Sequence, residues 1–425
     1  VLSALEVAAL ALGTRRRWRE LAEIYESILP RIADDVVAWD LGKKLGMLYR
    51  DELDDLDAAL RVFTVSAQKN LADVEIRFWL AELYEARQDH AASAEQMRQA
   101  AFSAPERGDV HRRALWCFEK TGDADAAWNA ACVLDQLGEA DINESLVADA
   151  HRPEGLINAR GAFGPDQWCD LRPERDEALD HVLALVTPAA VELRLERLEA
   201  GGQLPKLTDA TLQNPTGTTT LMRSLSWTAR LFGVQAPAVH VLPKVDGDLT
   251  PLPLGEGTAA AGIALASGLE LPDLAFLWAR VLAYLHPDHR LLVFYPTAPD
   301  VAKLLLAAMA VARDETAEGD AGVVAERLLS VLDDSARDEL ARAVTELGKK
   351  RLKSRVASHV RCVHAAAGRA GLVATGDLAR AISVVGRSPL RSGPSEAEQI
   401  GDLRAFAISA AHGRIRRHLG VALRS

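Results

Sequence analysis

The chain has 425 residues, of which 49% are hydrophobic and 26% charged, enough apolar material for two or three domain cores. Its formal net charge of -11 argues against a nucleic-acid or anionic-membrane partner, because such partners require a basic surface. No apolar run approaches the roughly 20 residues that cross a bilayer, so no membrane span is expected.

The cysteines are scattered and form no C-x-x-C pair. They are Cys117, Cys132, Cys169 and Cys362. Isolated thiols are typical of a reducing compartment, so we expect a cytoplasmic location. The chain begins at Val1 within a helical pattern, and we expect it to be part of a longer chain or a processed product.

A helical pattern repeats along residues 15–139, which are rich in Ala, Leu, Glu and Arg. The aromatic residues Tyr49, Tyr84 and Phe118 fall 35 and then 34 residues apart. A polar turn follows each aromatic, and a second helix then begins with small residues that allow close packing. These small residues are Ala58-Ala59, Ala91-Ala92 and Ala126-Ala127.

The spacing resembles the tetratricopeptide repeat, whose period is 34 residues. The middle repeat matches best, at Leu80, Ala81, Tyr84, Ala100 and Pro105. Residues 18–29 resemble the second helix of an earlier repeat. The resemblance implies an α-solenoid over residues 1–140, in which the concave face of the repeats between residues 39 and 139 binds a protein or peptide partner.

Residues 141–215 are predicted to form a helical connector. Turn-rich passages flank one amphipathic helix from about Glu174 to Glu199. Because proline disrupts helix interiors, we expect Pro188 to start a second helical piece.

A different pattern occupies residues 216–425. It predicts a helix over residues 218–233, a strand over 236–243 and a second strand from Ala260 to Ala266. A further helix begins at Pro272 and should end near His286, because the proline that follows disfavours helical geometry at that residue.

This order of elements resembles the catalytic domain of the zinc metallopeptidases that include the CAAX prenyl proteases and the HtpX heat-shock proteases. The resemblance rests on "LFGVQAPAVHVLP" and "IALASGLELPDLAFLWARVLAYLHPDH" and covers roughly residues 215–385. In that family the last of these helices carries H-E-x-x-H, whose histidines bind zinc and whose glutamate activates water. The resemblance places Arg280, Val281 and Tyr284 at those three positions, and His364 at the glutamate that is the third ligand.

These residues lack the family's chemistry. Arg280 cannot lose its proton to become a ligand, Val281 cannot act as a base, and Tyr284 is a poor zinc ligand at neutral pH. We therefore expect a mainly α protein whose solenoid precedes an α+β, mostly helical pseudoenzyme domain. No cofactor or metal is expected, and the expected function is that of a non-catalytic protein-binding scaffold or adaptor.

An active metal-dependent hydrolase with a relocated site is one alternative. His286 and His289, with Asp288 and His364, could supply ligands if the helix continued through Pro287. The proline instead favours solvated histidines at a helix end, where the helix macrodipole stabilises a cation.

A nucleic-acid-associated factor is the other alternative. The basic run from Lys349 to Arg361 could form one stripe on a helix and bind an acidic partner. The acidic segment Asp333–Glu346 immediately before it favours a solvated, charge-balanced face instead. The chain should close with a single docked helix, Glu396–Leu419.

Overall fold

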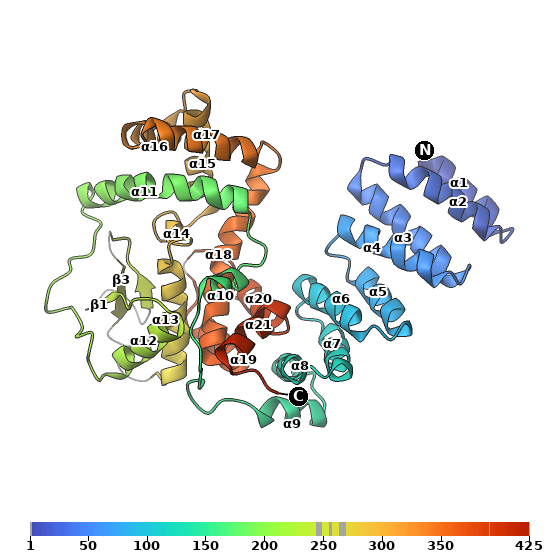
Figure 1. Cartoon of the computed structure of the whole chain (residues 1–425), viewed down its shortest axis with the longest axis horizontal. Helices are drawn as coiled ribbons and strands as arrows, with labels where there is room; N and C mark the ends of the chain where they lie inside the picture. Colours follow the sequence, from blue (N-terminus) through green and yellow to red (C-terminus); the bar gives the residue numbers. More distant parts are fainter. Residues whose placement is uncertain (1, 244–248, 255–256, 263–268, 391, 425) are drawn as a thin grey trace. The chain divides into compact units, whose positions relative to one another are not determined.

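The computed structural model describes residues 2–243, 249–254, 257–262, 269–390 and 392–424. Twenty-one α-helices and one small sheet of three strands make up most of the regular structure in these residues (Figure 1). The fold is mainly helical, as the sequence predicts. Within the same residues, no helix combines the length and apolar character of a membrane span.

The chain divides into two compact units. Unit 1 comprises Val1–His151, Ala407–Ser409 and Leu423–Ser425, and unit 2 comprises Arg152–Phe406 and Ala410–Ala422. The predicted connector, residues 141–215, contributes to both units. Its helix α9 (Ile142–Ala150) belongs to unit 1, whereas α10 (Pro165–Asp170) and α11 (Glu177–Ala200) belong to unit 2.

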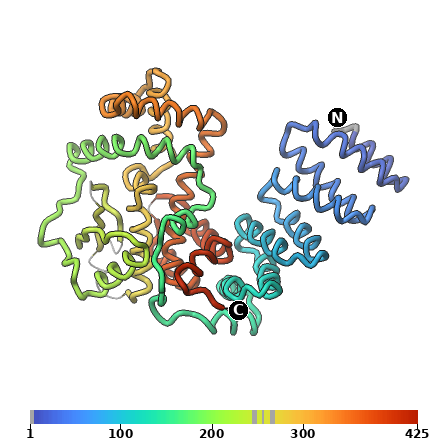
Figure 2. The backbone as a smooth tube through the Cα atoms, viewed as in Figure 1, coloured from blue at the N-terminus to red at the C-terminus, as the bar shows by residue number. Residues whose placement is uncertain are grey.

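Unit 1 is built from consecutive helix pairs, and each helix packs against the next along the chain (Figure 2). The pairs are α1 (Leu2–Gly13) with α2 (Trp18–Ile28), α3 (Asp35–Asp51) with α4 (Leu56–Lys69), α5 (Val74–Ala86) with α6 (His90–Ser103), and α7 (Gly108–Thr121) with α8 (Ala124–Leu137). A short 3₁₀ helix, η1 (Leu29–Arg31), lies between the first two pairs.

The polar turns predicted between paired helices are N-terminal caps. Three aspartates each accept a hydrogen bond from a main-chain N–H in the first turn of the second helix, which satisfies a donor that has no helical partner. They are Asp55, Asp89 and Asp123. The residue before each cap has a positive φ: 53° at Asp54, 60° at Gln88 and 71° at Gly122. The three turns therefore share one backbone conformation.

Unit 2 is organised around α13 (Leu271–Leu285), in which every residue from Pro272 to Tyr284 is buried. Its residues are buried on all sides and are apolar apart from Asp273 and Arg280, as expected for a helix in a core. It packs against α12 (Thr220–Leu231) and α18 (Leu352–Thr375). It ends at Leu285, which confirms the end predicted from Pro287.

A three-stranded sheet lies beside α13. It consists of β1 (Ala238–Leu242), β2 (Leu249–Pro251) and β3 (Thr258–Gly262) in the order β1-β3-β2. β3 runs parallel to β1 and antiparallel to β2, and all five of its residues are buried. The predicted strand Ala260–Ala266 overlaps β3, and its residues 263–266 lie outside the described residues.

Four helices form a separate layer of unit 2, in which α11 packs against the other three (Figure 1). The others are α15 (Ala298–Arg313), α16 (Gly319–Val331) and α17 (Asp334–Leu347).

The expected helix break at Pro188 is wrong, because α11 runs through this residue. Proline leaves the carbonyl of Ala184 without its helical donor. Both residues are exposed, so water can hydrate that carbonyl, and the hydroxyl of Thr187 donates to the carbonyl of Leu183 at 2.7 Å.

The single terminal helix predicted over Glu396–Leu419 is also wrong. Two helices, α20 (Glu396–Ala407) and α21 (Ala410–Leu419), replace it. At the break, the carbonyl of Ile408 accepts a hydrogen bond from Nε of Arg98 at 3.0 Å, within unit 1. Two other short helices of unit 2 are α14 (Leu291–Phe294) and α19 (Leu378–Arg387).

Candidate functional site

Positions from distant parts of the sequence meet at one cavity in unit 2. Arg280, Val281 and Tyr284 of α13 line it together with His364 of α18. The cavity has a volume of about 220 Å³. The rest of its wall is mainly apolar and consists of Leu249, Thr250, Pro251, Leu292, Val293, Pro296, Pro389, Leu390 and Ser392. The four residues that the metallopeptidase resemblance singled out are therefore neighbours in space.

Tyr284 and His364 form a buried hydrogen bond of 2.7 Å between the phenol oxygen and Nδ1. Burial raises the pKa of Tyr284 well above its usual range, so the phenol stays protonated and donates. Burial also lowers the pKa of His364, so the imidazole is neutral and accepts at Nδ1. Its remaining proton therefore lies on Nε2.

The N–H of His364 at Nε2 is buried and has no hydrogen-bond partner among the described residues. The main-chain carbonyl of Pro296 acts in the opposite direction to burial and raises the pKa of His364. Gly393 covers one edge of the ring, and a Cβ there would lie 2.8 Å from Nε2, so no other residue fits. Leaving such a donor without an acceptor costs about 1–3 kcal/mol.

Arg280 is fixed in the wall of the cavity by Ser388, which follows α19. Nη1 donates to the main-chain oxygen of Ser388 and Nη2 donates to its hydroxyl oxygen, each at 2.7 Å. No pattern in the sequence indicated Ser388, because it lies more than a hundred residues from Arg280. The positive charge of Arg280 opposes, without overcoming, the effect of burial on the pKa of Tyr284.

This set of side chains does not fit the zinc site of the metallopeptidases. A guanidinium, an isopropyl group and a protonated phenol occupy the positions that the resemblance assigns to the two histidines and the glutamate. The lone pair of His364 at Nδ1 is already used by Tyr284. The arrangement instead presents hydrogen-bond donors to an apolar cavity.

His289, at the end of α13, is not solvated, so that expectation was wrong for this residue, whereas His286 is half-buried. His289 is only 2% exposed, and its Nδ1 donates to the carbonyl of Ala283 at 2.8 Å. Burial lowers the pKa of His289 to about 3, with a further lowering by the charge of Arg172. The helix macrodipole stabilises a cation at this end, but His289 is neutral. His289 instead caps the helix by donating a hydrogen bond to a carbonyl of the last turn.

Trp168 of α10 packs against both of these histidines. The rings of Trp168 and His286 lie 4.3 Å apart and are inclined by only 30°, and the rings of His286 and His289 lie 5.3 Å apart. His364 contacts Tyr284 instead. In the described part of the chain, no group of three or more His, Cys, Asp or Glu side chains is placed to hold a metal ion.

A second cavity, of about 560 Å³, contains a charged network that sequence reasoning missed. Asp180 of α11 accepts hydrogen bonds from His359 Nδ1 at 2.9 Å and from Arg172 Nη2 at 3.0 Å. Burial alone would raise the pKa of Asp180, but the bond from His359 and the charge of Arg172 lower it. Asp180 and His359 lie far apart in the sequence, and no motif links them.

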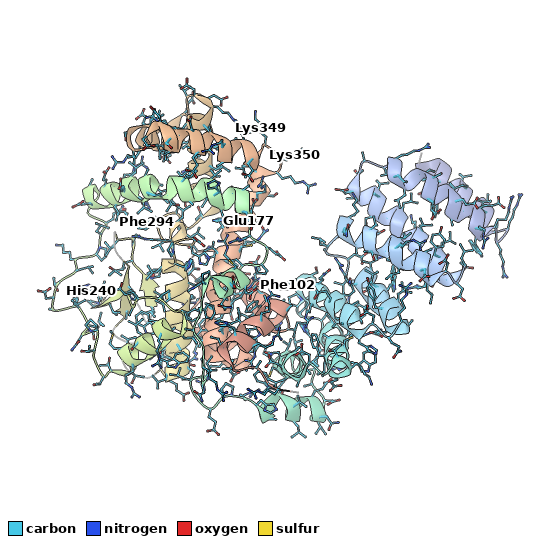
Figure 3. All side chains as sticks on the ribbon, viewed as in Figure 1. Phe102, Glu177, His240, Phe294, Lys349 and Lys350 are labelled. Atoms are coloured by element: carbon cyan, nitrogen blue, oxygen red, sulfur yellow. The ribbon has the colours of Figure 1, made fainter. Side chains whose placement is uncertain are left out.

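The basic run Lys349–Arg361 does not form one helical stripe, so that arrangement was wrong. Lys349 and Lys350 lie in the turn between α17 and α18 (Figure 3), and α18 begins only at Leu352. Arg355 pairs with Asp176, at the N-cap of α11, with a distance of 2.7 Å.

In unit 1, aromatic and cationic side chains connect the first helices of successive pairs. Lys43, Met47 and Arg50 are spaced to share one face of α3. Trp79 of α5 lies against this face, with its ring centroid 4.8 Å from Nζ of Lys43 and 4.9 Å from the guanidinium carbon of Arg50.

The connection continues from α5 to α7. Glu82, one turn after Trp79, has a carboxylate oxygen 3.8 Å from Nη1 of Arg113. Trp116, one turn after Arg113, is 38% exposed. We call this surface the first-helix face, and its residues are Lys43, Met47, Arg50, Trp79, Glu82, Arg113 and Trp116.

Neither a family model, nor a curated protein, nor a solved structure matches this chain. The resemblances to tetratricopeptide repeats and to metallopeptidases therefore rest on the residues quoted for them.

Proposed function

We propose that this protein is a non-catalytic scaffold or adaptor that binds a protein or peptide partner through the first-helix face of a tetratricopeptide-like array. The observation that carries the proposal is the continuity of that face over three helix pairs. Successive residues of the face are either one helical turn apart or in contact between the first helices of successive pairs, as Trp79 with Lys43 and Glu82 with Arg113 illustrate.

The composition of the face supports binding. Trp and Arg are the residue types that most often dominate the energy of protein interfaces. Met47, Glu82 and Trp116 fall 35 and then 34 residues apart, at the period of the repeat, and all three are exposed. Equivalent exposed positions at a regular spacing suit an extended or helical peptide that contacts several helices at once.

The cavity in unit 2 supports the non-catalytic part of the proposal. Arg280 and Tyr284 hold their protons through hydrogen bonds and burial, and Val281 has no ionisable group. Nothing in this set activates water as the metallopeptidase residues do.

Site-specific photo-crosslinking in the cells of origin tests the proposal. A photoreactive amino acid at position 47 or 116 of the full chain should give one recurrent crosslinked partner, identified by mass spectrometry. Truncating Arg113 and Trp116 to alanine together should reduce capture of that partner by about tenfold or more, as expected for residues at an interface centre.

Position 65 provides the matched control. Val65 lies on α4, a second helix, and is exposed like Met47. A photoreactive residue there should not capture the partner, and Val65→Ala should leave binding unchanged. Equal capture from positions 65 and 116 would exclude the first-helix face as the binding surface.

A further inference from the structure

The second cavity of unit 2, of about 560 Å³, contains a histidine with one unused ring nitrogen. His359 lines this cavity, and its Nδ1 is bonded to Asp180 at 2.9 Å. The hydrogen bonds that His359 makes among the described residues all use Nδ1, and Nε2 is not shut off from solvent. The whole residue is only 5% exposed, so Nε2 meets solvent at the cavity that the ring lines.

The partners of His359 decide which tautomer the ring adopts. Burial alone would raise the pKa of Asp180, but the bond from His359 and the charge of Arg172 lower it, so this carboxylate is ionised and accepts from Nδ1. A neutral imidazole that donates at Nδ1 presents a lone pair at Nε2. His359 therefore offers the cavity a hydrogen-bond acceptor, and Asp180 holds it in one orientation.

A main-chain carbonyl adds a second acceptor to the same wall. Ala184 and Pro188 of α11 both line the cavity, and Pro188 has no N–H to donate to the carbonyl of Ala184. A carbonyl oxygen that lacks its helical donor can accept from solvent or from a ligand. The two acceptors come from different helices, α18 and α11, and a ligand in the cavity can donate to both.

Two of the three carboxylates in the wall are balanced by arginines. Glu177, in the first turn of α11 (Figure 3), pairs with Arg175 at 3.0 Å. Asp180 pairs with Arg172, also at 3.0 Å. Arg175 is the one arginine or lysine among the described residues that line the cavity, and Glu177 already compensates its charge.

The third carboxylate, that of Asp288, is not balanced. Asp288 lines the cavity just after the end of α13, and it has no arginine or lysine partner in the described part of the chain. His286 lies 3.9 Å away, but burial lowers the pKa of His286, so this ring is neutral. The wall therefore combines an uncompensated negative charge with acceptors that lack donors. An ammonium group, which has three donors and no acceptor, matches both features.

The rest of the wall defines the body of the ligand. Leu183, Pro188, Pro287 and Leu291 offer apolar surface. A cavity of about 560 Å³ has room for about 19 water molecules at liquid density, so a chain of several methylene groups fits inside it. Because the acceptors come from three separate segments of the chain, a ligand with an ammonium group at each end can use more of them than a monoamine can.

We propose that the cavity lined by Asp180, His359 and Asp288 binds a linear aliphatic diamine, with one ammonium group at His359, the other at Asp288, and the methylene chain against Leu183 and Leu291. Binding here is independent of the partner proposed for unit 1. It requires no bond to be made or broken, so it is compatible with a non-catalytic protein.

Calorimetric titration of the full chain with 1,5-diaminopentane at pH 8 tests this assignment, with pentane-1,5-diol as the neutral probe of the same length. The diamine should bind once per chain and at least about tenfold more tightly than the diol, because its charged donors form stronger hydrogen bonds. His359→Leu removes the acceptor at Nε2 and should weaken diamine binding by about tenfold to a hundredfold.

A second pair of variants keeps the test decisive if His359→Leu does not fold. Ala184→Trp enlarges an exposed residue of the cavity wall and should abolish diamine binding, whereas Ala200→Trp, at an exposed position at the end of the same helix, should leave it unchanged. Absence of saturable diamine binding up to about 10 mM, equal affinity for pentane-1,5-diol, or binding that is indifferent to Ala184→Trp would each overturn the assignment.

Discussion

Among individual side chains, His289 shows how burial overrides the ordinary behaviour of a residue type. Its pKa in the folded chain is about 3, far below the value of 6.5 for an ordinary histidine. Below pH 6.5 the imidazole of His289 therefore binds a proton in the unfolded chain, whereas in the folded chain it stays neutral until the pH approaches 3. Stability from this group is complete above pH 6.5 and decreases as the pH falls toward 3, by about 1.4 kcal/mol per pH unit at most.

We predict that His289→Asn reduces this acid sensitivity. The Asn side chain can still donate to the carbonyl of Ala283 but does not titrate. Urea denaturation at pH 7 and pH 4 should show a smaller loss of unfolding free energy for the variant than for the natural chain. The same substitution at His151, which is exposed, is the control. An equal loss in both chains would mean that another group carries the acid sensitivity.

At the level of single residues, the sequence located part of the candidate site and missed the rest. Arg280, Val281, Tyr284 and His364 could be named because a family pattern gave them positions. Ser388, which orients Arg280, could not be found, because its role depends on a main-chain carbonyl and a hydroxyl brought in by tertiary packing. The prediction that His289 is solvated failed for the same reason, because the exposure of a side chain depends on tertiary packing and not on its neighbours in the sequence.

Among the helices, α18 packs closely against α13 at a glycine, Gly371. A Cβ at Gly371 would overlap the ring of Phe276, which is fully buried. We predict that Gly371→Ala lowers the unfolding free energy of unit 2 by about 1–3 kcal/mol, because the core must expand to admit the methyl group. Thermal unfolding followed by circular dichroism would measure the change.

Gly368, one turn earlier on α18, is the matched control. A Cβ there meets only Leu403, at an ordinary distance of 3.7 Å. Gly368→Ala should therefore be neutral or should stabilise the helix by about 0.5–1 kcal/mol. If both variants lose stability equally, helix propensity or an unrelated effect, and not the Phe276 contact, explains the loss.

Helix ends were predictable where local chemistry decides them. Pro287 ends α13 and the aspartate caps start the second helices, since both act through their nearest neighbours. The prediction failed at Pro188, where solvent on one side and packing on the other keep the helix continuous. The prediction of one terminal helix failed at Ile408, because Arg98, which is distant in sequence, donates a hydrogen bond to the carbonyl of Ile408.

For the chain as a whole, unit 1 is not contiguous in sequence. The main-chain N–H of Leu423 donates to the carboxylate of Asp125 on α8 at 3.0 Å, and Arg98 on α6 donates to Ile408. We predict that a fragment ending at His151 is less stable than the same helices in the full chain. Each lost bond involves a charged group and contributes about 1.5–3 kcal/mol.

Hydrogen-deuterium exchange of α6 and α8 would measure this difference. The fragment should exchange faster in both helices, while α3 and α4, which lie outside these bonds, serve as the internal control. Equal protection of α6 and α8 in fragment and full chain would show that the C-terminal residues contribute no stability there.

The mainly helical class followed directly from composition and periodicity, because helix formation is largely local. The tertiary arrangement did not. Only the family resemblance indicated that α13 and α18 meet at the cavity in unit 2, and no sequence pattern indicated the Asp180 network that joins α11 to α18.

The discontinuity of unit 1 also bears on how this protein could be recombined. The chain leaves and re-enters unit 1 around residues 407–409 and again before residue 423. A gene fusion that exchanged everything after His151 for another domain would remove structural pieces of the helix pairs along with it. Recombination that separates the two units is therefore expected to reduce stability, and we expect the units to occur together in related chains.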